Sequence, residues 1–248
     1  EDFPLGTNYV AQFDNLHARL DAILKEVDTA AILAEARKSM EQGKTDPEDV
    51  VYLTNHGSNH VEQVVQRTTD LLRDSGCTLS AYEGYILLSA ILFHDVGNIY
   101  GRKYHEARAW EIMNTLGSLA GTDNLERRTI IKIARVHGGA FDGSKDTISQ
   151  LQERDDILNK PVRKRLLAAL LRFGDELADD YSRASRYMLY TGMIPTNSQI
   201  YHRYSDSLKS VRVEGGEVRL RFDFDEEDAL KEYRKNGRST FLLDEIND

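Results

Sequence analysis

Apolar residues recur at helical spacing over most of this 248-residue chain. Residues three or four positions apart share one face of a helix, so these runs predict amphipathic helices. We expect helices within about 10–40 and then at about 58–74, 80–94, 103–117, 125–137 and, longer than the rest, 162–190. The polar stretch 138–161 predicts a loop between the last two.

The pattern changes near the C-terminus. Val211 and Val213 alternate with polar residues, and so do the apolar residues from Val218 to Phe224. Gly215-Gly216 lies between the two runs, and this arrangement predicts a β-hairpin. The predicted fold class is therefore mainly α, a helical bundle with a small C-terminal β-hairpin.

Three regions follow from this change of pattern. Residues 1–48 are expected to form an N-terminal helical extension, and residues 49–195 to form the helical core. Residues 196–248 are expected to hold the C-terminal β-hairpin and a tail that packs on the core.

Composition narrows the classes of partner and compartment. The net charge of -9 disfavours long duplex nucleic acid as a partner, because phosphate binding needs a basic face. The single cysteine excludes a disulfide within the chain and favours a cytoplasmic location. No apolar run approaches the roughly 20 residues that span a bilayer, so no membrane partner is expected. The chain begins with Glu1 rather than Met, which is compatible with a larger parent protein, and a homo-oligomer is compatible too.

Several polar side chains occupy positions where the predicted helices should present apolar ones. His60 precedes Val64 by four residues, and Asp175 follows Leu171 by four. A lone buried histidine is more often a satisfied core residue, and Asp175 alone can pair with Arg172. Burying several such groups without partners is costly, however, and a shared cation satisfies all of them at once. The six groups are His60, His94, Asp95, His105, His137 and Asp175.

The chemistry of these donors indicates which cation they suit. Imidazole nitrogen and carboxylate oxygen without thiolate suit Mn, Fe, Ni, Co or Zn, as one or two ions. A closed structural zinc site would more often use cysteine. A site of His and Asp with open positions favours hydrolysis, because a metal lowers the pKa of bound water and orients a phosphate.

Three segments carry a resemblance to a known family. They read NHVEQVV around His60, ILFHDVGN around His94 and Asp95, and LLRFGDELADD around Asp175. This ordered set, within about residues 50–190, resembles the HD-domain superfamily of metal-dependent phosphohydrolases. The resemblance implies an HD-domain helical bundle. It also implies hydrolysis of a nucleotide or short oligonucleotide phosphoester, with metal-activated water as the nucleophile.

The resemblance also assigns expected roles to residues between the motifs. Family members with two metals carry extra histidines between the HD pair and the final Asp, and His105 and His137 stand in that order. Asp95, His105 and His137 are therefore expected to be catalytic, the two histidines as ligands of a second ion. Alternatively, the two histidines bind substrate phosphate or support the first ion. Asn98 stands where the family often has a lysine, so a role for that position is open.

Substrate contacts are less sharply predicted. The candidates for substrate binding are His56, Arg102, Lys103, Lys132, Arg135 and Lys145. A cluster of tyrosines follows the last motif, and tyrosine can stack on bases, although at helical spacing it more often packs in a core. Two other functions stay open. One is a metal-dependent single-stranded nuclease, and the other is a nucleotide-binding regulatory module of a larger protein.

Overall fold

The computed structural model describes residues 58–100, 105–116, 123–139, 143–184, 186–235 and 237–247. The expected N-terminal extension lies outside these ranges, and so do His56, Arg102 and Lys103. Within them, no helix is long and apolar enough to cross a membrane.

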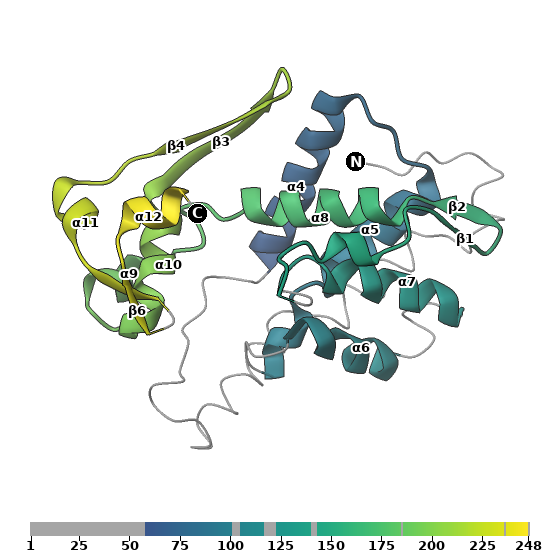
Figure 1. Ribbon diagram of the computed structural model, residues 1–248, viewed down its shortest axis with the longest axis horizontal. Coiled ribbons are helices and arrows are strands. Elements are labelled where there is room, and N and C mark those ends of the chain that lie inside the picture. Colours follow the sequence, from purple (N-terminus) through teal and green to yellow (C-terminus); the bar gives the residue numbers. More distant parts are fainter. Residues whose placement is uncertain are drawn as a thin grey trace.

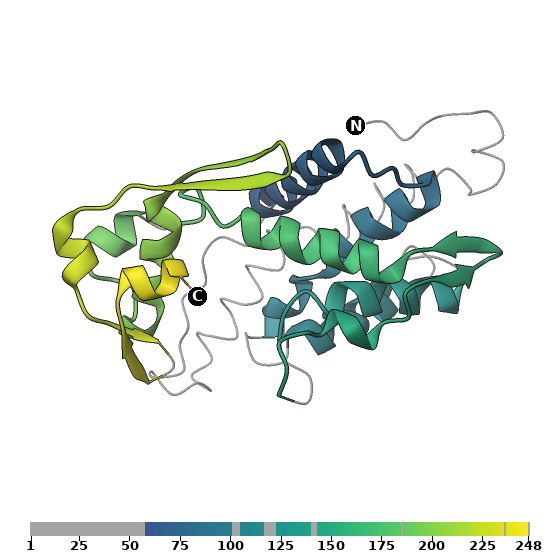
Figure 2. The same cartoon turned by 45° about the horizontal axis from the view of Figure 1, so that its top comes forward.

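A body of five helices forms one side of the molecule (Figures 1 and 2). It consists of α4 (Ser58–Ser75), α5 (Ala81–Phe93), α6 (His105–Leu116), α7 (Asn124–Arg135) and α8 (Lys164–Leu177), with the 3₁₀ turn η2 (Val96–Tyr100) between α5 and α6. The four predicted helices before residue 138 are confirmed. Their apolar faces meet in one cluster in which Val64, Tyr85, Phe93 and Ile130 are fully buried.

The start of α5 shows how the sequence sets a helix boundary. Ser80 accepts a hydrogen bond from the backbone N–H of Glu83, and the Glu83 carboxylate accepts one from the backbone N–H of Ser80. Arg163, just before α8, also donates to this carboxylate through Nε and Nη2, each at 2.8 Å. Burial alone would raise the pKa of Glu83, but the hydrogen bonds from Arg163 and Ser80 lower it to about 2.

The single helix predicted at 162–190 is wrong. The chain leaves the helix after Leu177, turns, and forms the short α9 (Arg186–Tyr190). The Asp180 carboxylate accepts the backbone N–H of Ser182 at 2.9 Å. This local bond offers the backbone an alternative to the helix, which periodicity alone does not reveal.

The stretch 138–161 contains more structure than the predicted loop. A 3₁₀ turn, η4 (Ile148–Gln150), precedes a small antiparallel pair of β1 (Asp155–Ile157) and β2 (Lys160–Val162). The two turn residues, Leu158 and Asn159, both have positive φ. Asn accepts this conformation readily, but Leu does not, which is why the turn gave little signal in the sequence.

The C-terminal elements form a second group beside the helical body (Figures 1 and 2). After α9 they are α10 (Thr196–Ser207), β3 (Leu208–Glu214), β4 (Glu217–Phe222), α11 (Glu226–Leu230), β5 (Tyr233–Lys235), β6 (Arg238–Thr240) and α12 (Leu242–Asn247). The predicted hairpin is confirmed as β3–β4, and both turn glycines have positive φ. The mainly α fold with a small C-terminal hairpin is thus confirmed. The division at residues 48 and 195 stays a prediction.

The β3–β4 hairpin reaches back from this second group to α4 (Figure 1). At its turn, Gly215 and Gly216 donate their backbone N–H groups to the carboxylate of Asp74, at 2.7 and 2.8 Å. Val211 on β3 packs with Leu177 at the end of α8. These contacts join the hairpin to the helical body at its turn and along β3.

Helices α4 and α8 approach closely because α8 has a glycine where they meet. A Cβ atom at Gly174 would come within 3.0 Å of Thr68 Oγ1, and it would lie 3.2 Å from the backbone oxygen of Val64. Both partners belong to α4. The next residue in α8 is Asp175, so this close packing decides how far its carboxylate lies from α4.

Candidate metal centre

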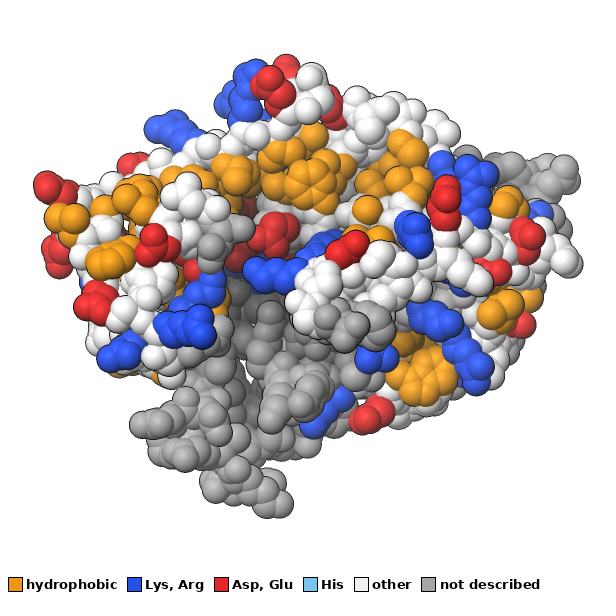
Figure 3. All heavy atoms as spheres, in the orientation of Figure 1, with side chains coloured by type: hydrophobic (Ala, Val, Ile, Leu, Met, Phe, Trp, Pro, Cys, Tyr) orange, Lys and Arg blue, Asp and Glu red, His pale blue; other side chains and the backbone are white. Residues whose placement is uncertain are grey.

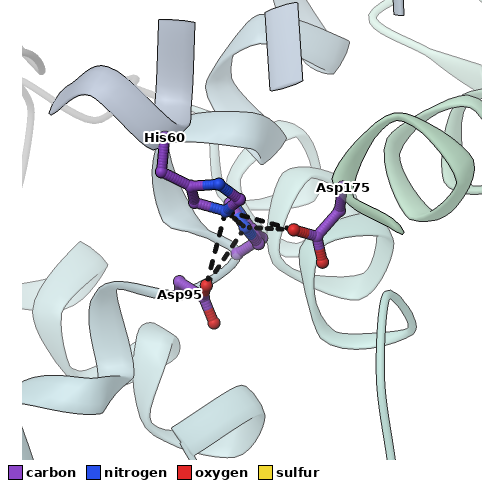
Figure 4. A group of neighbouring side chains, drawn as sticks. His60, Asp95 and Asp175 are labelled. Carbon is purple, nitrogen blue, oxygen red and sulfur yellow. Dashed lines mark hydrogen bonds and ion pairs between the residues drawn. The ribbon is translucent and has the colours of Figure 1, made fainter. Parts of the chain in front are cut away.

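Three separate segments bring four polar side chains together inside the helical body (Figure 4). His60 comes from the first turn of α4, His94 and Asp95 directly follow α5, and Asp175 belongs to the last turn of α8. Each offers one ligand atom, and these four atoms all lie within 4.8 Å of one another. The two histidines are each 1% exposed.

Short distances join the donors. His60 Nε2 lies 3.1 Å from Asp175 Oδ1, and His94 Nε2 lies 3.3 Å from Asp95 Oδ2. The two Nε2 atoms are themselves 3.3 Å apart. Two imidazole lone pairs at this distance repel unless a proton or a cation stands between them, so the cluster has a place for one positive charge.

The backbone fixes which nitrogen of His94 faces the cluster. Its Nδ1 lies 2.6 Å from the carbonyl oxygen of Ile91. A carbonyl only accepts, so Nδ1 carries a proton and donates it. In the neutral ring, Nε2 therefore presents its lone pair to the carboxylates, which is the arrangement typical of metal-binding histidines.

Without a metal, the cluster favours a single proton on the histidine pair. Burial would lower the pKa of His94, but the charges of Asp95 and Asp175 raise it well above its ordinary value. Burial lowers the pKa of His60, and the nearby Arg183 and His94 lower it further. Burial would raise the pKa of Asp175, but the contacts with His94 and His60 bring it well below its ordinary value. A divalent cation would replace that proton and balance both carboxylates.

The donor set fits a divalent transition metal. Two neutral imidazoles and two carboxylates supply the nitrogen and oxygen ligands that Mn, Fe, Co, Ni and Zn accept. The Asp175 side chain keeps 22% of its surface exposed, so the cluster is reached by solvent on that side. Such a site resembles catalytic sites, which keep a position open, more than closed structural ones.

His137 lies at the edge of this cluster, where its ring meets that of His94 edge-on with centroids 5.0 Å apart. Its Nδ1 is 2.6 Å from the carbonyl oxygen of Ala134, so its Nε2 also presents a lone pair in the neutral ring. That Nε2 lies 3.7 Å from Asp95 Oδ1. The two oxygens of Asp95 thus face different histidines, Oδ2 facing His94 and Oδ1 facing His137.

Asn98 has a part in this geometry that the sequence left open. Its side-chain amide donates to Asp95 Oδ1 at 3.0 Å, and its backbone N–H donates to the Asp95 carbonyl at 2.9 Å. The amide therefore orients the carboxylate that both histidines face. A polar residue three positions after Asp95 was visible in the sequence, but its direction was not.

Among the remaining predicted residues, the structure describes the side chains of Lys132, Arg135 and Lys145. His105 begins α6, and the position of its side chain lies outside the described part of the chain. Lys132 and Arg135 are exposed on α7, and Lys145 is exposed in the following segment. The pKa of Asp155 is lowered mainly by its hydrogen bond with Lys164, and the charge of Lys132 also lowers it. Substrate roles for these residues stay predictions.

Arg183 is a residue that sequence reasoning missed. It is 7% exposed, and its Nη1 lies 3.6 Å from Asp179 Oδ1. Burial lowers the pKa of His60, the hydrogen bond with Asp175 raises it, and the positive charge of Arg183 lowers it. No sequence pattern marks it, because Arg183 lies beyond the end of α8 in a turn that was expected to be helical.

Helix α5 is followed directly by the His94-Asp95 pair, and His60 and Asp175 converge on this pair. This arrangement defines an HD-type domain whose His/Asp cluster can hold a metal ion. The chain matches the family model HD-CE over residues 50–248 and belongs to the HD-CE family. No curated protein and no solved structure matches the chain.

Proposed function

We propose that the protein is a metal-dependent phosphohydrolase that acts on a nucleotide or short oligonucleotide phosphoester. The observation that carries this proposal is the convergence of His60, His94, Asp95 and Asp175 within 4.8 Å, on a side that solvent reaches. Membership of the HD-CE family supports an HD-type hydrolase as the class.

The four residues of the cluster would hold the first ion through His60 Nε2, His94 Nε2 and one oxygen each of Asp95 and Asp175. A bound divalent ion lowers the pKa of a coordinated water and offsets the charge of a phosphoester. The Ile91 carbonyl keeps the His94 ring in its ligand tautomer. The Asn98 amide donates to Asp95 Oδ1 and so orients this carboxylate, whose Oδ2 faces His94 and whose Oδ1 faces His137.

A second ion would be held by Asp95 Oδ1 and His137 Nε2, which lie 3.7 Å apart. Two ions would supply positive charge for both the attacking and the leaving oxygen of the phosphoester. We retain His105 as a further ligand of that ion on sequence grounds alone.

Arg183 is our choice for the residue that balances phosphate charge. It is a buried guanidinium whose positive charge contributes to the lowered pKa of His60, and arginine pairs well with phosphate oxygens. Lys132 and Arg135 lie exposed on α7 and are weaker choices on this geometry.

Metal analysis combined with turnover tests the proposal. Purified protein should contain about one or two transition-metal ions per chain and hydrolyse a nucleotide or short oligonucleotide after loading with Mn or Fe. Asp175→Asn and His94→Gln should lose both metal and turnover. Asp70→Asn is the matched control, because Asp70 lies on α4 and pairs with Arg67 and Arg73 outside the cluster. Normal turnover in Asp95→Asn would refute the proposed mechanism.

The same assay tests the second ion. His137→Ala should lower the bound metal by about one ion per chain and leave the first ion in place. An unchanged metal content would make His137 a substrate-side group instead.

A further inference from the structure

The turn after α8 lies directly against the helix that carries His60. Gln63 on α4 donates through Nε2 to Ser182 Oγ at 2.6 Å and to Asp180 Oδ1 at 3.2 Å. Gln63 lies three residues after His60 on α4. The turn therefore contacts α4 about one helical turn away from His60. Tyr181 stands between these two anchored residues, and its backbone N–H donates to the Leu208 carbonyl at 3.2 Å.

Tyr181 presents an exposed ring at this position, with an arginine over it. The residue is 46% exposed, and the guanidinium carbon of Arg186 lies 5.6 Å from the ring centroid. Arg186 is itself held by Asp206, whose Oδ1 accepts its Nε at 2.5 Å. Asp206 is 7% exposed, so a buried carboxylate fixes the direction of the arginine.

The same three-part arrangement occurs a second time, at the end of α9. Tyr190 is 68% exposed, and the guanidinium carbon of Arg203 lies 5.1 Å from its ring centroid. Arg203 is held by Asp228, with Nη1 3.0 Å from Oδ2. An exposed tyrosine, an arginine over its ring and an aspartate that fixes the arginine thus appear twice within the C-terminal group.

Such pairs suit a nucleic-acid strand. An exposed aromatic ring stacks on any base, and an arginine that an aspartate holds over the ring keeps that ring in one orientation. Two such platforms have room for two bases, whereas a mononucleotide needs one. Acidic and basic side chains are interspersed over the described part of the face in Figure 3, which fits local recognition of a short strand better than a continuous duplex track.

We propose that Tyr181 and Tyr190 are base-stacking platforms, and that the ligand of this surface is a short single-stranded oligonucleotide whose phosphoester reaches the metal cluster beside Tyr181. This inference rests on the proposed function and narrows its substrate class. The alternative interpretation is that the arginine over each tyrosine only stabilises the local structure. On that interpretation the two tyrosines contribute nothing to binding of a strand.

Equilibrium binding to a fluorescent hexathymidylate tests the proposal in the 248-residue chain, with metal present and hydrolysis blocked by a non-hydrolysable backbone. Tyr181→Leu and Tyr190→Leu keep apolar bulk but remove the aromatic face. Each should weaken binding by about fivefold to 150-fold, the range that loss of one stacked base gives. Tyr181→Trp should bind the strand as tightly as the unsubstituted protein or more tightly.

Tyr187→Leu is the matched control, because Tyr187 is 73% exposed on the same short helix. It should bind within about twofold of the parent protein. A strand of the same length without bases should bind equally to all variants, since it offers nothing to stack. Thermal melting of each variant checks that the fold is kept.

The outcomes separate this inference from the proposed function. Hydrolysis of a nucleotide together with unchanged strand binding in both Leu variants would overturn the stacking platforms and leave the hydrolase in place. Strand binding that depends on Tyr181 and Tyr190, without any hydrolysis, would support the platforms and refute the hydrolase. No strand binding by the parent protein, or an equal loss in Tyr187→Leu, would also overturn the inference.

Discussion

Substitution of Gly174 tests whether the packing of α4 on α8 sets the geometry of the metal cluster. A Cβ at this position would come within 3.0 Å of Thr68 Oγ1, which is closer than real Cβ contacts. Thr68 is 3% exposed and its hydroxyl is bonded to the Leu170 carbonyl of α8, so it has little room to turn away. The two helices must therefore separate or distort in Gly174→Ala.

The expected cost combines two opposing effects. Overpacking of a close contact costs about 1–3 kcal/mol, whereas replacing a helical glycine by alanine gains up to about 1 kcal/mol. Gly174→Ala should therefore lower the free energy of unfolding by about 1–2 kcal/mol. Since Asp175 follows directly, separation of the helices should also weaken metal binding.

A second substitution makes the test specific. Thr68→Ala removes the atom that the new methyl group would meet, and the remaining contacts, to the Val64 oxygen at 3.2 Å and to the Thr68 nitrogen at 3.4 Å, need only a small shift. In that background, Gly174→Ala should be neutral or stabilising. The coupling free energy in the double-mutant cycle should be about 2 kcal/mol, with the pair more stable than addition of the single effects predicts.

Urea denaturation of the four proteins measures this cycle, and competition with a chelator measures metal affinity in each. Additive effects on unfolding, with no rescue by Thr68→Ala, would refute the argument that Gly174 is required for close approach. Loss of stability with unchanged metal affinity would refute the link between the helix contact and the position of Asp175.

Three further perturbations test other parts of the structure. Asp74→Ala should speed amide hydrogen exchange at the β3–β4 turn, with a local cost of about 1–2 kcal/mol, while exchange in α5 stays unchanged. Glu83→Gln removes a carboxylate whose pKa Arg163 and Ser80 hold at about 2. That lowered pKa stabilises the fold above pH of about 4.5 and the effect is lost as pH falls towards 2, so the variant should be less stable at pH 7 by no more than about 2 kcal/mol, and the difference should vanish in acid. Chelation should lower the melting temperature of the parent protein, because a metal at 100 times its Kd stabilises by about 2.7 kcal/mol, and Asp175→Asn should not respond.

The placement of the cluster was predictable because helical periodicity and the residue types agree. His60 and Asp175 each fall on the apolar face of their helix, four residues from Val64 and Leu171, and both of those are fully buried. Two buried faces that pack together must bring their polar exceptions together as well. The ordered motifs, together with the apolar helix before His94, then indicated that His94 and Asp95 belong to the same cluster.

Other features depend on contacts that a sequence pattern does not contain. The helix predicted at 162–190 ends at Leu177, and in the turn that follows the Asp180 carboxylate accepts the backbone N–H of Ser182, a local bond that periodicity does not reveal. The β5–β6 pair has three residues in each strand, too few for alternation to show. Arg183 lies in the turn that replaces the expected helix. Its burial was not predicted, because the end of that helix was predicted in the wrong place.

The turn that ends α8 connects the cluster to the C-terminal group. If the helix had continued to residue 190, the chain after Leu177 would have extended away from α4 along the axis of α8. Because the chain turns after Leu177, Asp180 and Ser182 dock on Gln63, and the residues around them are brought back to the start of α4. The same turn leads into α9 and the second Tyr-Arg pair. The turn that holds Tyr181 therefore lies against α4, the helix that carries His60. A substitution that restores helix there should weaken strand binding while the metal is retained.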